Sequence, residues 1–409
     1  MKSNFFILFL AQITVAVAGL AIPPAIPFIQ PSLRLTYAQV GSLMTCMYLG
    51  AMIISLPSGG LTDRLGIKGT VLLSQVYTAL VAFFFSLIGS YWAILLCSIA
   101  IGIGYGMVNP PTTKGILVLV GQGNRALAMS AKQTGVPLAG AIAAAVVPPL
   151  GMRFSWEVSF VLTGAVIGLS ALATHLFYDP CHENTSHAPS THQVGEGDWR
   201  AIYRNRNVVF LSIAGALCSL AQASIGTYTI LYARDSQRLS LILAAFCLTL
   251  VNIAGVLGRL LWGVMSDRFF RGSRKFVLQF ITALILAVSL VLGIAIRLPL
   301  AFLFPLFFLL GFSAFGWNGV FLVFGGELAG SHQAGRATGF IMTIVFLGNL
   351  TGPLLFGKII DATGGYRLAW IFVAAAMAVA LCCMQKIREG KEHPERKEGS
   401  NALIRQEEE

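Results

Sequence analysis

The chain has 409 residues, of which 56% are apolar and only 11% are charged, and its formal net charge is +11. Soluble domains carry about 25% charged residues, so this composition cannot supply the wetted surface of a soluble chain of this length. It excludes a soluble enzyme, a nucleic-acid-binding domain and a disordered protein as the main interpretation. We expect most of the chain to be surrounded by lipid.

Twelve apolar stretches, each long enough to cross a bilayer as a helix, follow one another along the sequence. They cover residues 5–28, 38–59, 70–89, 92–119, 126–150, 156–178, 207–231, 239–262, 276–296, 300–325, 337–360 and 368–388. The runs are continuous rather than alternating, which excludes a β-barrel. The sequence therefore predicts an all-α membrane protein with twelve transmembrane helices.

The distribution of positive charge predicts the orientation of these helices. With a cytoplasmic N-terminus, the inner loops and tails hold eighteen lysines and arginines and the outer loops hold six. Because short cytoplasmic loops are enriched in these residues, we expect both termini to be cytoplasmic and the protein to be a multi-pass protein of the cell (inner) membrane.

One polar stretch divides the helices into two groups of six. We predict an N-terminal six-helix bundle over residues 1–178, a cytoplasmic linker loop over 179–206 and a C-terminal six-helix bundle over 207–388. The charged tail over 389–409 is expected to be disordered and cytoplasmic.

The two halves also share a motif. A G-x-x-x-D-R sequence, followed by a glycine and a base, comes after the second predicted helix, and a weaker copy comes after the eighth. The first copy contains Gly59, Asp63, Arg64, Gly66 and Lys68; the second contains Asp267 and Arg268.

With its doubled motif, twelve spans and central cytoplasmic loop, the chain resembles the major facilitator superfamily. The resemblance implies two pseudosymmetric six-helix bundles, a central substrate cavity and rocker-switch alternating access. It also implies a gating role for the motif, in which Asp63 braces the two bundles near the start of the eleventh helix. The expected gating residues are Gly59, Asp63, Arg64, Gly66, Lys68, Arg125, Asp267, Arg268 and Arg336.

Ionisable residues within membrane helices are costly and are functional candidates. Lys132 shares a helix face with the small residues Gly135, Ala139 and Gly140, so it is expected to point into the protein; the alternative is that it snorkels to the cytoplasmic interface. Arg259 belongs to the second motif region, and we expect a structural role for it. No aspartate or glutamate lies near mid-membrane to neutralise Lys132.

Uncharged polar residues lie on the helices that line the cavity in the resembling family. Each could instead make only an inter-helix hydrogen bond. With Lys132 as counter-charge, the predicted substrate-binding residues are Gln133, Asn109, Thr113, Gln222, Trp317 and Asn318.

These features predict a secondary active transporter of a small organic anion, for which a monocarboxylate is one candidate, with a proton as a possible coupling ion. The alternatives are an efflux pump for hydrophobic or drug-like compounds and a non-transporting membrane sensor with the same fold. The sequence contains no nucleophile–base set, Cys/His metal cluster or phosphate loop, so we expect no enzymatic activity, metal or cofactor. We expect a monomer that does not bind nucleic acid.

Overall fold

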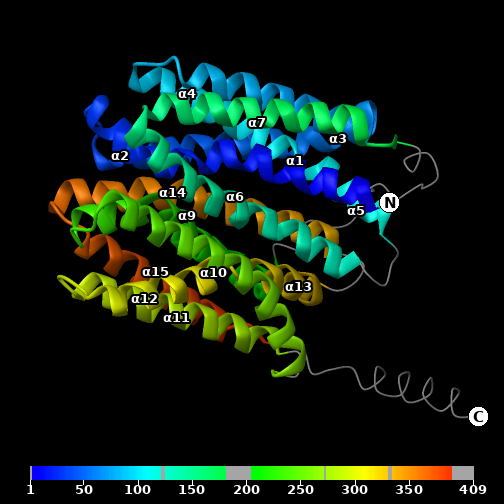
Figure 1. Ribbon diagram of the computed structural model, residues 1–409. Helices are drawn as coiled ribbons and strands as arrows, with labels where there is room; N and C mark the ends of the chain where they lie inside the picture. Colours follow the sequence, from blue (N-terminus) through cyan, green and yellow to red (C-terminus); the bar gives the residue numbers. More distant parts are fainter. Residues whose placement is uncertain (1, 121–124, 181–203, 271–272, 330–333, 389–409) are drawn as a thin grey trace, which may run out of the picture.

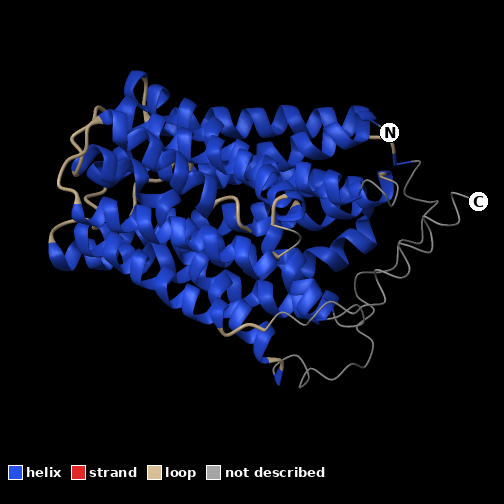
Figure 2. Cartoon of the chain, turned by 90° about the horizontal axis from the view of Figure 1, so that it is seen from below, coloured by secondary structure: helices blue, strands red, loops and turns tan. Residues whose placement is uncertain are grey.

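The computed structural model describes residues 2–120, 125–180, 204–270, 273–329 and 334–388. Figure 2 shows that these residues are helical apart from short connections. In Figure 1 the helices lie side by side in two groups, with the N-terminal half above the C-terminal half.

The N-terminal half begins with α1 (Lys2–Leu20) and α2 (Ile22–Ser32), which together make the first span. It continues with α3 (Tyr37–Phe85), α4 (Tyr91–Met107), α5 (Asn109–Leu119), α6 (Arg125–Arg153) and α7 (Trp156–Phe177). The C-terminal half comprises α9 (Arg206–Asp235), α10 (Leu241–Arg268), α11 (Arg274–Ile294), α12 (Leu300–Ala314), α13 (Asn318–Ala329), α14 (Ala334–Thr363) and α15 (Arg367–Gln385).

These elements form 12 helical segments that are long and apolar enough to cross a membrane. The predicted all-α membrane fold with two six-helix bundles is therefore confirmed. The lipid-facing surface is visible on α7, where Leu162, Leu169 and Leu176 are 44%, 67% and 62% exposed. Their spacing of seven residues places them on one side of the helix, and a solvent of lipid chains explains why large apolar side chains cover it.

The long helix α3 contains the second and third spans, and the chain reverses direction within it at Gly66. This residue has φ 73° and ψ 175°, a left-handed conformation that glycine adopts at little steric cost. The hydroxyls of Ser42, near the start of α3, and Tyr91, just after its end, lie 2.9 Å apart. Both ends of α3 are therefore at the same end of the molecule, and Gly66 of the first motif lies at the turn between its two spans.

Three of the spans are interrupted near their middle. The first breaks at Ala21, ahead of Pro23 and Pro24, and the fourth breaks at Val108, ahead of Pro110 and Pro111. Proline lacks the N–H that would continue the helical hydrogen bonds. The tenth span breaks over residues 315–317, between α12 and α13. The fourth and tenth spans occupy equivalent positions in the two halves, and paired interruptions of this kind mark binding sites in transporter folds.

Two pairs of helices carry much of the contact between the halves: α3 packs on α14, and α6 packs on α10. Glycine allows the first pair to approach closely. A Cβ atom at Gly357 would overlap the main-chain oxygen of Tyr37, and one at Gly41 would overlap that of Pro353. The two backbones therefore touch across the boundary between the halves.

Candidate functional site

The predicted lysine lies at the break in the fourth span. The Lys132 ammonium, on α6, donates hydrogen bonds to Asn109 Oδ1 (2.6 Å), Thr113 Oγ1 (2.7 Å) and the Asn109 carbonyl oxygen (3.1 Å). Lys132 is 1% exposed, so it does not snorkel to the surface. Three predicted residues are thus brought together, and all three acceptors of this buried cation are uncharged.

A second group of predicted residues meets at the break in the tenth span. Trp317 Nε1 and Asn318 Nδ2 both donate to Gln222 Oε1 of α9, at 3.0 and 3.3 Å. Trp317 is buried, whereas Gln222 and Asn318 are half-buried. Each half therefore places an amide-containing polar cluster at the interruption of one of its own helices.

Arg259, for which the sequence suggested only a structural role, connects the halves at their centre. On α10, its Nη1 donates to the main-chain oxygen of Gln133, the neighbour of Lys132, and its Nε donates to the Phe315 carbonyl oxygen at 3.0 Å. Phe315 lies within the break of the tenth span. Gln133, predicted to bind substrate, thus uses its main chain to hold Arg259.

A second cation at the centre changes the electrostatics of the site. Arg259 is held by the residue next in sequence to Lys132, so two cationic side chains are bound near this segment of α6, one from each half. Within the described part of the chain, the hydrogen-bond acceptors of both are neutral oxygens. Positive charge with neutral acceptors in a membrane interior is a setting that favours an anionic ligand.

A small cavity of about 30 Å³ lies between the halves beside this region. Tyr48 and Gly140 line it from the N-terminal half, and Gln222, Asn252 and Phe315 line it from the C-terminal half. Lys132 is set back from this cavity and is covered by its three acceptors. Gln222 and Phe315 connect the cavity to the two polar clusters described above.

The predicted gating aspartates each bind a cation of their own half. Asp63 Oδ1 lies 2.7 Å from the Lys114 ammonium, and Asp267 pairs with Arg274, whose Nε lies 3.7 Å from Glu327 Oε1. The Asp63 and Lys114 side chains are 57% and 41% exposed. The structure therefore shows Asp63 bonded to α5; the start of the eleventh span, where the family resemblance placed its partner, lies outside the residues whose side chains are described.

The other predicted gating residues surround these pairs. Arg64 and Arg268 are exposed, Lys68 is half-buried, and Gly59 precedes Asp63 by one helical turn. Arg125 is the first residue of α6, and Arg336 is the third residue of α14. The side chains of both lie outside the described residues. The predicted linker and tail also fall largely outside them, at residues 181–203 and 389–409.

The described residues form twelve apolar spans in two halves, with paired breaks and a polar centre, and so define a multi-pass membrane protein. The sequence model of one protein family, the Major Facilitator Superfamily, matches residues 6–353 of this chain. The chain belongs to this family, as its doubled motif indicated.

Two relatives are similar along nearly the whole chain. A hexuronate transporter of Bacillus subtilis is 25% identical over 386 residues, which cover 91% of this chain and 90% of that protein. A probable sulfoacetate transporter of Cupriavidus necator is 24% identical over 92% of this chain and 89% of its own length. In fold, the chain is similar to a bacterial homologue of the human lysosomal transporter Spinster, with a TM-score of 0.75 at 16% identity, covering 95% and 98% of the two chains.

Proposed function

We propose that this protein is a secondary active transporter of a small organic anion, which it moves by alternating access between its two halves. The observation that carries the proposal is the Lys132 ammonium, which is 1% exposed and bound by neutral oxygens of Asn109 and Thr113. A substrate anion would supply the missing negative charge. Arg259, held by carbonyl oxygens of both halves, provides a second cation near the boundary between them.

The relatives support this class of substrate, because hexuronate and sulfoacetate are both organic anions. We infer that the anionic group of the substrate is bound between Lys132 and Arg259. The Gln222, Trp317 and Asn318 cluster faces the same centre from the other half, where its amide and indole groups would bind polar groups of the substrate.

We further propose that both termini are cytoplasmic, as the distribution of lysine and arginine predicts. The start of α3 and the end of α14 then face the outside. Thr45 Oγ1 donates to the Leu350 carbonyl oxygen at 2.7 Å, and the Tyr228 hydroxyl donates to the Tyr37 carbonyl oxygen at 2.6 Å. These bonds close the halves together on the outer side, which supports a state that is shut to the outside.

The test is uptake by the purified full-length protein in liposomes. A panel of labelled organic acids, including hexuronate and sulfoacetate, would be compared with neutral and cationic solutes, with and without a pH gradient. We expect saturable uptake of at least one anion and its loss in Lys132→Gln. The matched control is Lys358→Gln, because Lys358 is an exposed lysine near the outer end of α14. Uptake restricted to cationic or hydrophobic solutes would overturn the proposal.

A further inference from the structure

One buried amide at the boundary between the halves has an oxygen with no hydrogen-bond partner among the described residues. Asn252 of α10 is 4% exposed. Its Nδ2 donates to the Leu248 carbonyl oxygen at 2.9 Å, and because a carbonyl can only accept, Oδ1 must lie at the other end of the amide. A buried oxygen without a donor is costly, so Asn252 is a candidate for contact with a ligand.

The free oxygen of Asn252 lies against the other half of the protein. A Cβ atom at Gly140 of α6 would overlap Asn252 Oδ1, so the amide rests on the backbone of that glycine. Both residues line the cavity of about 30 Å³ between the halves. A cavity of this volume holds one water-sized group, and a single hydroxyl group has that size.

The same cavity offers hydrogen-bond donors. Gln222, which lines it, uses Oε1 to accept from Trp317 and Asn318, while its Nε2 donates to no described residue. The hydroxyl of Tyr48, from α3, also has no partner within the described part of the chain. A hydroxyl both donates and accepts, so a ligand hydroxyl here could donate to Asn252 and accept from Gln222 or Tyr48. None of the described lining residues is a carboxylate, so an ammonium group would lack a counter-charge.

The Asn252 amide lies two helical turns from the cation of its own helix. Asn252 and Arg259 are seven residues apart on α10, and the residues that they touch on α6, Gly140 and Gln133, are also seven apart. Seven residues span about 10 Å along a helix and return to the same side. With a hydrogen bond of about 3 Å at each end, about 4 Å remains between the two groups of a ligand that would bridge these positions.

From this geometry we propose that Asn252 is a specificity-determining residue, and that the transported anion carries a hydroxyl group several bonds from its acidic group. In this arrangement the acidic group lies between Lys132 and Arg259, and the hydroxyl donates to Asn252 Oδ1 beside Gly140. A hydroxyl on the carbon next to the acidic group is too close to it to reach Asn252. The proposal rests on the proposed function, since it adds a second group to the anion assigned there.

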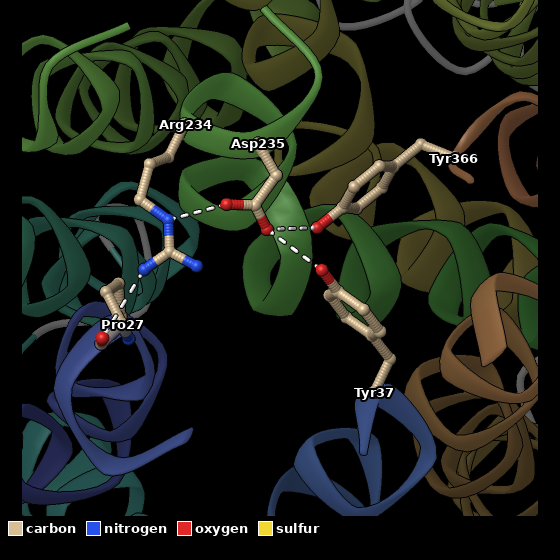
Figure 3. Close-up of polar contacts among 5 residues, drawn as sticks. All are labelled: Pro27, Tyr37, Arg234, Asp235 and Tyr366. Carbon is tan, nitrogen blue, oxygen red and sulfur yellow. Dashed lines mark hydrogen bonds and ion pairs between the residues drawn. The ribbon is translucent and has the colours of Figure 1, made fainter. Parts of the chain in front are cut away.

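The structure is closed around this cavity at the end where α3 begins. The Tyr37 hydroxyl donates to Asp235 Oδ2 at 3.1 Å, and the Tyr366 hydroxyl donates to the same oxygen at 3.0 Å (Figure 3). Asp361 accepts from the main-chain N–H groups of Tyr37 and Ala38. A ligand of several carbon atoms therefore needs the halves to separate before it enters, so binding is measured on the whole protein, free to open.

A matched set of pentanoic acids tests the proposal on the purified full-length protein. Pentanoate has no hydroxyl, 2-hydroxypentanoate has one beside the carboxylate, and 4-hydroxypentanoate has one further along the chain. Equilibrium binding of each would be measured. We expect 4-hydroxypentanoate to bind about tenfold more tightly than either of the others, which is the gain from one hydrogen bond in a site built to receive it.

Variants of Asn252 should remove this preference. Asn252→Leu should bind pentanoate like the parent and lose the preference for 4-hydroxypentanoate, because the acceptor is gone and the anion site is intact. Asn252→Ser serves if the leucine variant folds poorly, since a serine hydroxyl in a helix bonds back to the preceding turn and does not reach Gly140. Thr249→Val is the matched control: Thr249, also on α10 but outside the cavity, bonds back to the Ala245 oxygen at 3.1 Å. It should keep the parental preference.

The outcomes distinguish a failure of the hydroxyl site from a failure of the anion site. Equal binding of pentanoate and 4-hydroxypentanoate by the parent would overturn the role of Asn252 and leave the anion site standing. A preference that survives in the Asn252 variants, or an equal loss of both acids in them, would do the same. If the neutral 4-hydroxypentanamide binds like the acid, with the same dependence on Asn252, the anion site fails and the hydroxyl site stands. If none of these compounds binds, a hydroxylated acid is not the ligand.

Discussion

Arg259 of α10 donates a hydrogen bond to the main-chain oxygen of Gln133 on α6, so a charged side chain of one half is held by the backbone of the other at the centre of the protein. The same guanidinium binds Phe315 in the break of the tenth span, as Lys132 binds Asn109 at the break of the fourth. A cation therefore lies at the interruption in each half. These two cations, on the fifth and eighth spans, are the basis of the proposed anion site.

The contact of α3 with α14 depends on glycine, and one methyl group should disturb it. In Gly357→Ala the new Cβ would overlap the Tyr37 oxygen, so we expect the closed outer arrangement to be disfavoured. The readout is the distance between spin labels at Gly89→Cys, just after α3, and Ala362→Cys, in the last turn of α14; it should lengthen while the helical content stays unchanged.

Two other glycines provide the comparison. A Cβ at Gly348 would overlap the Ala216 oxygen within the C-terminal half, so Gly348→Ala should lower thermal stability, by about 1–3 kcal/mol. A methyl group at Gly319 would have no other atom within 4 Å, so Gly319→Ala should change neither the outer distance nor the thermal stability. A parental outer distance in Gly357→Ala would show that the contact of α3 with α14 accommodates the methyl group without opening.

Gln222 is the shared acceptor of the second polar cluster. In Gln222→Leu, Trp317 Nε1 and Asn318 Nδ2 lose their acceptor, which should cost about 0.6–2 kcal/mol of stability for each inter-helix bond. Because we place this cluster at the substrate, affinity in a binding titration should fall as well. Trp317→Phe removes one of the two bonds and should give a smaller loss. Reduced stability with unchanged affinity would assign the cluster to packing alone.

Asp63 is expected to affect transport more than stability. Its bond to Lys114 is largely exposed, and exposed ion pairs contribute about 0–1 kcal/mol. We predict that Asp63→Asn reduces uptake, leaves substrate affinity near normal and shifts the conformational balance toward greater cytoplasmic opening. Labelling of cysteines introduced at the cytoplasmic ends of α5 and α14 measures this shift. Normal uptake with unchanged labelling would leave the motif as a turn and nothing more.

The proposed orientation can be tested without a substrate. Reporter domains fused after Glu409, or inserted near His187, should both be cytoplasmic, because the lysine and arginine bias places these segments inside. A reporter inserted after Gly89 should be on the opposite side and serves as the control. A periplasmic signal from either of the first two fusions would overturn the proposed orientation.

Much of the fold follows from hydropathy, because twelve continuous apolar runs leave no alternative to helices in lipid. The cluster of Lys132 with Asn109 and Thr113 could be anticipated in part, since a buried lysine requires polar neighbours and the fourth predicted run, 92–119, contains both residues. Gln222, Trp317 and Asn318 likewise belong to helices that face the centre.

Other features depend on tertiary contacts that the linear pattern does not encode. Arg259 lies beside the second motif, so its neighbours in sequence favoured a structural role, whereas its contacts with Gln133 and Phe315 join residues far apart in the chain. The cluster of Tyr37, Arg234, Asp235 and Tyr366 (Figure 3) could not be predicted because Arg234 and Asp235 fall beyond the predicted seventh run, where the sequence favours a loop. The helix α9 in fact continues to Asp235.

Binding of a transported anion to purified Lys132 variants, at matched expression, is the most direct test of the proposed anion site. Lys132→Gln should lose binding by at least about 100-fold, because removing one partner of a buried charge pair costs about 3–5 kcal/mol. Lys132→Arg should retain part of it, and Lys358→Gln should match the parent. If Lys132→Gln folds and binds the anion like the parent, Lys132 is only a packing residue satisfied by Asn109 and Thr113, and the account of an anion site is contradicted.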